Sequence, residues 1–93
     1  MKYDVAVIGG GVVGALISRE LSKYDVKAAV LERCNDIAMG TTKANSAIVH
    51  GGFDAVSGTV KAKLNVEGTA IMPKLCKELN VPYRNNGSLV VAF

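Results

Sequence analysis

"VIGGGVVGALISREL", residues 7–21, joins the end of an apolar run to a helical pattern through three consecutive glycines. Gly9, Gly11 and Gly14 have the spacing G-x-G-x-x-G, in which Gly10 has no role. Gly9 would allow a tight turn, Gly11 a close backbone approach to a pyrophosphate, and Gly14 close packing of a helix on a strand. The spacing predicts a dinucleotide-binding loop. The alternative is a tight turn between a strand and a helix, with no ligand.

The residues on either side of this loop have the patterns of a strand, a helix and a second strand. Residues 3–8 (YDVAVI) are apolar without strict alternation, which is typical of a strand buried in a parallel sheet. Apolar residues recur every three or four positions over residues 12–23, which predicts an amphipathic helix. Residues 27–32 (KAAVLE) have the composition of a second strand. The three segments together predict a right-handed βαβ unit with parallel strands.

An acidic residue lies at the end of the second predicted strand. At this place the carboxylate of Glu32 could accept hydrogen bonds from the ribose hydroxyls of an adenosine. Its negative charge disfavours a 2′-phosphate, because like charges repel. The neighbouring Arg33 is the one argument for NADP. We therefore expect a dinucleotide without the 2′-phosphate, either NAD or FAD.

The chain continues with a segment that has no sustained period. Residues 33–58 are rich in glycine, threonine, asparagine and serine, and so long a segment inside a compact domain is usually functional. Residues 81–87 have turn-forming composition, and residues 88–93 (SLVVAF) predict a third strand. That strand would form an apolar edge, so we expect the isolated chain to self-associate through it.

A longer helix is predicted between these two segments. Residues 59–80 have apolar side chains at helical spacing, and Ser57 or Thr59 could cap the start. Pro73 lies inside this pattern. A proline removes one helix hydrogen bond and crowds the carbonyl four residues earlier. The pattern therefore predicts either a kink near residues 69–73 or two separate helices.

The composition excludes several classes of protein. The chain has 93 residues, 49% of them hydrophobic, which indicates a single globular domain. Its 11 Lys and Arg and 8 Asp and Glu are scattered, which argues against a nucleic-acid partner. Cys34 and Cys76 lie far apart and there is one histidine, so we expect no metal site and two buried free thiols.

Residues 5–17, the most apolar stretch, are too short to cross a membrane. We expect a cytoplasmic protein, and peripheral membrane association of the complete enzyme is the alternative.

Residues 40–52 (GTTKANSAIVHGG) resemble a known cofactor-binding segment. They are similar to the second flavin-contacting segment of the D-amino-acid oxidase superfamily of FAD enzymes, which often reads G-x-S/T-x-x-N-S-x-x-x-H-x-G. Residues 3–21 and residues 58–68 (GTVKAKLNVEG) extend the resemblance over essentially the whole chain. The chain most resembles the branch that contains FAD-dependent glycerol-3-phosphate dehydrogenases and L-2-hydroxyglutarate oxidases.

The resemblance implies FAD as the cofactor and an α/β fold, namely part of a Rossmann-like FAD-binding domain. This part would consist of a βαβ unit, an irregular flavin-contacting segment, a helix and the start of a further strand. Residues 1–87 would belong to the FAD-binding domain, and residues 88–93 would lead into a substrate domain outside this chain.

The resemblance also implies an oxidoreductase. The full-length protein would transfer a hydride to flavin from a small hydroxy compound such as glycerol 3-phosphate or a 2-hydroxy acid, and this 93-residue chain alone would be inactive. The alternatives are a non-catalytic nucleotide-binding module of a multichain assembly and an NAD-linked dehydrogenase.

The resemblance further implies a set of cofactor-binding residues, and it assigns no catalytic residue. The pyrophosphate would lie against Gly9, Gly11 and Gly14, the ribose against Glu32, and the adenine side against Arg33. The phosphates and ribityl chain would meet Thr41 and Thr42, and the isoalloxazine ring would lie nearer to Asn45, Ser46 and His50. Three roles stay open for His50: packing, a contact that tunes the flavin or the substrate, and a covalent bond to the flavin.

Overall fold

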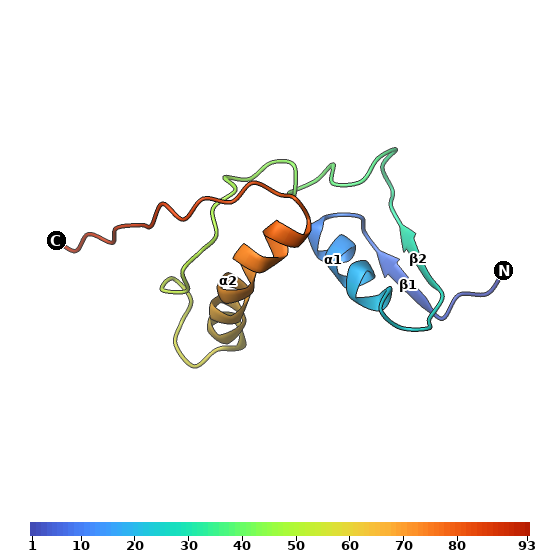
Figure 1. Cartoon of the computed structure of the whole chain (residues 1–93), viewed down its shortest axis with the longest axis horizontal. Coiled ribbons are helices and arrows are strands. Elements are labelled where there is room, and N and C mark those ends of the chain that lie inside the picture. The colour runs from blue at the N-terminus through green and yellow to red at the C-terminus, as the bar shows by residue number, and fades with distance from the viewer. The chain divides into compact units, whose positions relative to one another are not determined.

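The computed structural model describes residues 1–93, which form two strands and two helices (Figure 1). Along the chain they are β1 (Val5–Ile8), α1 (Val12–Leu21), β2 (Ala28–Leu31) and α2 (Val60–Glu78). The chain divides into two compact units, Met1–Ser46 and Ala47–Phe93. The first contains β1, α1 and β2, and the second contains α2.

The first unit is the predicted βαβ unit. β1 and β2 pair in parallel, with Val5 opposite Ala28 and Ile8 opposite Leu31, and α1 is the crossover between them (Figure 1). At the start of the sheet, the Lys27 amide donates to the Asp4 carboxylate at 2.8 Å. The α/β class is confirmed, and the arrangement is compatible with part of a Rossmann-like FAD-binding domain.

The second unit is built on α2, which is one helix and not two. The Thr59 side chain caps its start by accepting a hydrogen bond from the Ala62 amide at 3.2 Å. Pro73 lies inside the helix. It lacks an N–H, and this leaves only the carbonyl of Thr69 without its usual partner. The helix nevertheless continues through Pro73 to Glu78.

The end of α2 has a specific cause. Asn80 has a φ of +55°, in the left-handed region that asparagine tolerates better than most residues. The Val81 amide donates to the Cys76 carbonyl at 2.8 Å and the Asn80 amide to the Lys77 carbonyl at 3.3 Å. These two bonds form a Schellman motif, which ends the helix.

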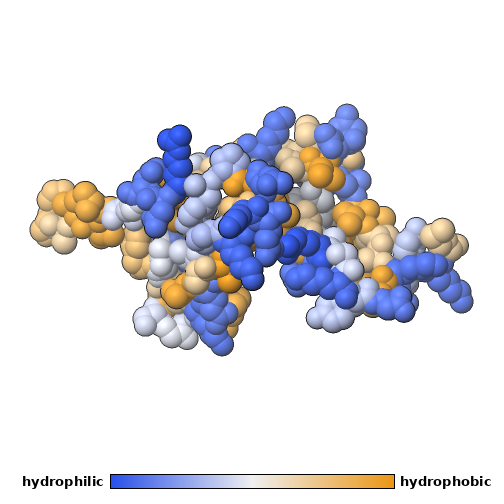
Figure 2. Space-filling view, in the orientation of Figure 1, coloured by the Kyte–Doolittle hydropathy of each residue, from blue (hydrophilic) through white to orange (hydrophobic).

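Few side chains are buried in either unit. Val7 is 8% exposed and Cys76 is 6% exposed, and they are the only buried apolar residues. Figure 2 shows apolar residues in orange beside charged ones in blue across the visible surface. Neither unit therefore encloses a large core of its own. Neither helix is both long enough and apolar enough to span a membrane.

Two expectations differ from the structure. Residues 88–93 form no strand, and the only sheet is the pair β1 and β2. An extended segment becomes a strand only through backbone hydrogen bonds to a neighbour, and residues 88–93 make none. Cys76 is a buried free thiol as expected, but Cys34 is exposed. Cys34 follows β2 directly, in a segment without regular structure that covers little of it.

Candidate functional site

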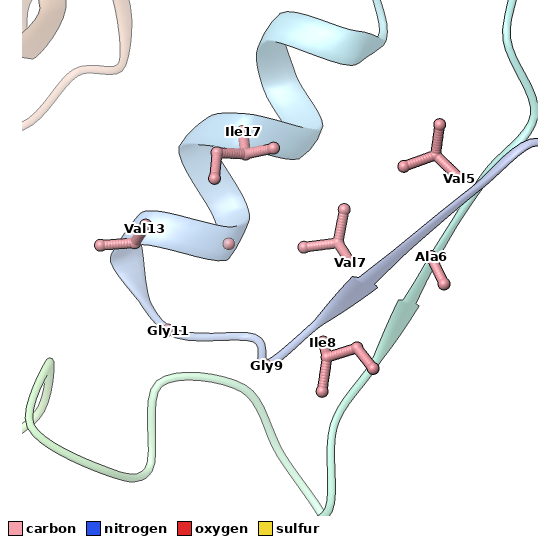
Figure 3. A pocket seen from close by; sticks show the side chains of 9 residues that line it. Val5, Ala6, Val7, Ile8, Gly9, Gly11, Val13 and Ile17 are labelled. Atoms are coloured by element: carbon pink, nitrogen blue, oxygen red, sulfur yellow. The ribbon is translucent and has the colours of Figure 1, made fainter.

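The glycine loop forms the turn between β1 and α1. Figure 3 shows Gly9 and Gly11 at this turn and Val7 between the strand and the helix. Gly9 has a φ of +105°, which is strained for any residue with a side chain. A Cβ on Gly14 would overlap the carbonyl oxygen of Gly9. Glycine at residue 14 therefore allows α1 to begin directly against the loop.

The N-terminus of α1 presents backbone amides that have no partner inside the helix. The first backbone bond of the helix runs from the Ala15 amide to the Gly11 carbonyl at 2.9 Å, so the amides of residues 12–14 have no acceptor there. The Val12 amide donates instead to Thr42 Oγ1 at 2.9 Å. A Cβ on Gly11 would lie 3.1 Å from the same Oγ1. This end of the helix, with its positive dipole, is suited to an anionic oxygen.

Glu32 connects the end of β2 to the glycine loop. Its Oε2 accepts a hydrogen bond from the Gly10 amide at 2.8 Å, and its Oε1 accepts one from the Cys34 amide at 3.0 Å. The bond from Cys34, followed by that from Gly10, lowers the pKa of the Glu32 carboxyl. Hydrogen bonds from the Arg33 amide and the Cys34 thiol lower this pKa further. The carboxylate is thus held in place and ionised at neutral pH.

Gly10 contributes to the site although the motif spacing gives it no role. It is buried, and a Cβ there would lie 3.0 Å from Ile37 Cγ2 and 3.2 Å from Glu32 Oε2. Its carbonyl accepts a hydrogen bond from the Ala38 amide at 2.9 Å. Gly10 therefore lets Glu32 and Ile37 approach the loop. The third consecutive glycine was the only signal of this role in the sequence.

A cleft of about 510 Å³ lies between the glycine loop, the end of β2 and the segment that follows it. This volume is within the range of small-molecule sites, about 300 to 1,000 Å³. Six of the predicted cofactor-binding residues line the cleft: Gly9, Gly11, Glu32, Arg33, Thr41 and Thr42. The structure thus brings together residues from three places in the chain that the sequence assigned to one ligand.

The other predicted residues of the first unit do not line this cleft. Gly14 packs α1 against the loop, as described above. The Asn45 side-chain amide donates to the carbonyls of Thr41 at 3.1 Å and Thr42 at 2.9 Å, so Asn45 holds the backbone that carries both threonines. Ser46 is exposed.

His50 belongs to the second unit and is exposed there. Its Nδ1 lies 3.8 Å from Asp54 Oδ2, a long contact. Its backbone is held more firmly, because the His50 carbonyl accepts hydrogen bonds from the side chains of Asn65 and Thr69 on α2.

A second cavity, of about 460 Å³, lies beside β1 and α1 and carries no ionisable group. Val5, Val7, Val13 and Ile17 are among the residues that line it (Figure 3). The side chains of this lining can pack against apolar groups, but none of them can pair with a ribose hydroxyl or hold a proton. The polar cleft is therefore the candidate cofactor site.

Residues 4–93 match the family model described as FAD dependent oxidoreductase. The chain belongs to this family. The family is FAD-dependent, so the prediction of FAD as the cofactor is confirmed and the NAD-linked alternative is disfavoured.

The relatives that the chain matches are dehydrogenases and oxidases by name. It is 55% identical to a glycerol 3-phosphate dehydrogenase of Caloramator mitchellensis, over 98% of this chain and 19% of that protein. It is 40% identical to a mitochondrial L-2-hydroxyglutarate dehydrogenase of Dictyostelium discoideum, over 97% of this chain and 21% of that protein. It is 37% identical to a glycerol 3-phosphate oxidase of Mycoplasma genitalium, over 97% of this chain and 24% of that protein. The chain thus spans about a fifth of the length of these relatives.

The residues of the cleft fit this cofactor. Gly11 has no side chain, and a Cβ there would narrow the space that faces Thr42. The Val12 amide at the N-terminus of α1 is a donor suited to a phosphate oxygen. Glu32 offers a carboxylate that is held in place. FAD carries a pyrophosphate and an adenosine ribose, which need these two kinds of partner.

Proposed function

We propose that this chain holds FAD in an enzyme that oxidises a small hydroxy compound by hydride transfer to the flavin. One observation carries the proposal: the α1 N-terminus, the Glu32 carboxylate and the hydroxyls of Thr41 and Thr42 meet at one cleft. The names of the relatives support the substrate class, which is a glycerol phosphate or a 2-hydroxy acid.

Each part of the cleft has a chemical role in this proposal. The pyrophosphate would bind the amides after Gly9 and Gly11, where α1 offers donors and positive potential. The ribose would donate its hydroxyls to Glu32, whose lowered pKa keeps the acceptor ionised. Arg33 would border the adenine. Arg33 lines the same cleft and adds positive charge to it.

The Thr42 hydroxyl occupies the place at the N-terminus of α1 that we propose for a phosphate oxygen of FAD. It accepts from the Val12 amide at 2.9 Å, while a threonine hydroxyl can also donate. A phosphate oxygen would replace Thr42 as the acceptor of that amide, and the Thr42 hydroxyl would then donate to the phosphate. Asn45 holds the backbone of Thr41 and Thr42, which would keep both hydroxyls in reach of the phosphates and the ribityl chain.

Bound FAD would supply the hydride acceptor, and the protein would orient the cofactor and the substrate around it. In this proposal Ser46 and His50 lie nearer to the isoalloxazine ring. Residues 1–87 are part of the FAD-binding domain, and residues 88–93 lead into the substrate domain. A cytoplasmic location fits the two free cysteines, since disulfides are rare in that compartment.

The test is reduction of the bound flavin by candidate substrates in the complete protein. The protein is purified, its flavin is identified, and glycerol 3-phosphate and L-2-hydroxyglutarate are added separately under anaerobic conditions. We expect bound FAD and bleaching of its absorbance by one of the two compounds. Bound FAD that neither compound reduces would contradict the substrate class, and absence of FAD would contradict the cofactor site.

A further inference from the structure

Two side chains of α2 converge on the backbone carbonyl of one distant residue. Asn65 Nδ2 donates to the His50 carbonyl at 2.8 Å, and Thr69 Oγ1 donates to the same oxygen at 2.5 Å. Asn65 Nδ2 also lies 3.3 Å from Thr69 Oγ1. Both side chains are half-buried. Thr69 Oγ1 also lies 2.9 Å from the Asn65 carbonyl oxygen, and its single proton goes to the shorter contact at His50.

The spacing of the two donors explains how they act together. Residues 65 and 69 are four apart on α2, so they lie on one face of the helix, one turn from each other. The same face approaches the chain again two residues after His50. Gly52 has a φ of +107°, and a Cβ there would lie 2.8 Å from Val66 Cγ2. Residues 50–52 are therefore held against α2 by two hydrogen bonds and one close approach.

The His50 side chain has no comparable anchor of its own. Its imidazole is 63% exposed, and its ionic neighbour, Asp54, lies 3.8 Å away. The backbone at His50 therefore determines the space that the ring can reach. We propose that Asn65 and Thr69 are positioning residues that fix His50 for its contact with the flavin. This inference rests on the proposed function, which places His50 near the isoalloxazine ring.

The first test removes each donor in the complete protein with FAD bound. Thr69→Val and Asn65→Ala are compared with the parent, with Thr69→Ser as the conservative variant that keeps a hydroxyl. We expect Thr69→Val and Asn65→Ala to retain FAD, because the proposed phosphate and ribose contacts lie in residues 9–42. We also expect them to change the flavin absorption spectrum and to slow flavin reduction by about tenfold to a hundredfold, as misplacing a group at a reacting centre does. Thr69→Ser keeps the hydroxyl and should have the flavin spectrum and the reduction rate of the parent.

A control separates positioning from helix stability. Thr59→Ala removes the N-cap of α2 and should lower the stability of the helix. It leaves the bonds to the His50 carbonyl in place. We expect Thr59→Ala to lower the thermal midpoint without changing the flavin spectrum. If it changes the spectrum as Thr69→Val does, the effect follows helix stability and the inference is wrong.

The second test is a double-mutant cycle with His50→Ala. If Asn65 and Thr69 act through His50, Thr69→Val should slow flavin reduction in the parent and have no further effect in the His50→Ala variant. An undiminished effect in that variant would overturn the inference.

The outcomes also separate this inference from the proposed function. If the parent binds no FAD, or if His50→Ala changes neither the flavin spectrum nor its reduction, the proposed place of His50 is wrong and the inference fails with it. If His50→Ala changes both while Thr69→Val and Asn65→Ala change neither, the proposed function stands and the inference alone is wrong.

Discussion

Gly14 and Gly68 both lie inside helices, but their surroundings differ. A Cβ on Gly14 would overlap the Gly9 carbonyl oxygen, whereas a Cβ on Gly68 would meet nothing within 4 Å. We expect Gly14→Ala to lower the free energy of unfolding by about 1–3 kcal/mol, the usual cost of overpacking. Gly68→Ala should raise it by about 0.5–1 kcal/mol, because alanine favours a helix.

Chemical denaturation of the complete protein measures both variants. The comparison is matched, because each change adds one methyl group inside a helix. Equal effects of the two substitutions on the free energy of unfolding would show that α1 does not approach the loop as closely as described.

Glu32 should make stability depend on acid pH. Its folded-state pKa is lowered by the bonds from Cys34 and Gly10, so the ionised carboxylate stabilises the folded chain above about pH 4.3, the ordinary value for glutamate. This contribution decreases as the pH falls through the folded-state pKa, where the carboxylate takes up a proton. We expect the parent to exceed Glu32→Gln in thermal midpoint at pH 7 and to lose that advantage towards pH 3. A difference that does not change with pH would contradict this role.

The spacing of residues in the sequence indicated some of the contacts in the cleft and not others. Gly9, Gly11 and Glu32 were predicted because a motif fixes their distance along the chain and their role together. Neither the role of Gly10 nor the bond between Val12 and Thr42 was predicted. Both depend on contacts between residues that are 22 to 30 positions apart, and a local pattern carries no information about such contacts.

At the scale of elements, hydrophobic periodicity predicted four segments correctly. The observed bounds of β1, α1, β2 and α2 lie within two residues of the predicted ones, because apolar runs and helical spacing are local properties of the sequence. The predicted third strand failed for a physical reason. The residue types in 88–93 favour an extended backbone, but a strand also requires a neighbouring strand to pair with.

Pro73 gives the prediction that belongs to α2. The helix continues through it, so the carbonyl of Thr69 lacks the hydrogen bond that an N–H at residue 73 would donate. Pro73→Ala would supply that donor and remove the crowding of the ring. We expect the free energy of unfolding to rise by about 1–3 kcal/mol, up to the usual cost of a proline inside a helix.

The substitution Lys74→Ala, at the next position, is the control, because lysine and alanine have similar helix propensities. It should leave the free energy of unfolding nearly unchanged in the same denaturation experiment. A lower free energy of unfolding in Pro73→Ala than in the parent would contradict this prediction, because it would mean that the proline stabilises α2.

At the scale of the whole molecule, exposed apolar residues predict association. Leu89 is 95% exposed and Val91 is 69% exposed, and an unpaired apolar segment invites pairing with another chain. We propose that the isolated 93-residue chain self-associates through residues 88–93. Replacing Leu89 and Val91 together by lysine should shift its sedimentation towards the monomer.

The control for this association adds the same charge elsewhere. Ser57 and Asn85 are exposed and polar, and replacing both by lysine should leave sedimentation unchanged. An isolated parent chain that stays a single monomeric species at high concentration would contradict self-association.

The central claim is that FAD binds in the cleft at the N-terminus of α1, and a titration of the complete apoprotein with FAD tests it most directly. Gly11→Ala places a methyl group 3.1 Å from Thr42 Oγ1, inside this cleft, and Gly68→Ala places one in open space. We predict that Gly11→Ala weakens FAD binding about tenfold or more, the equivalent of one lost hydrogen bond to a charged group, and that Gly68→Ala binds FAD like the parent. Equal affinity of all three proteins for FAD would contradict the account.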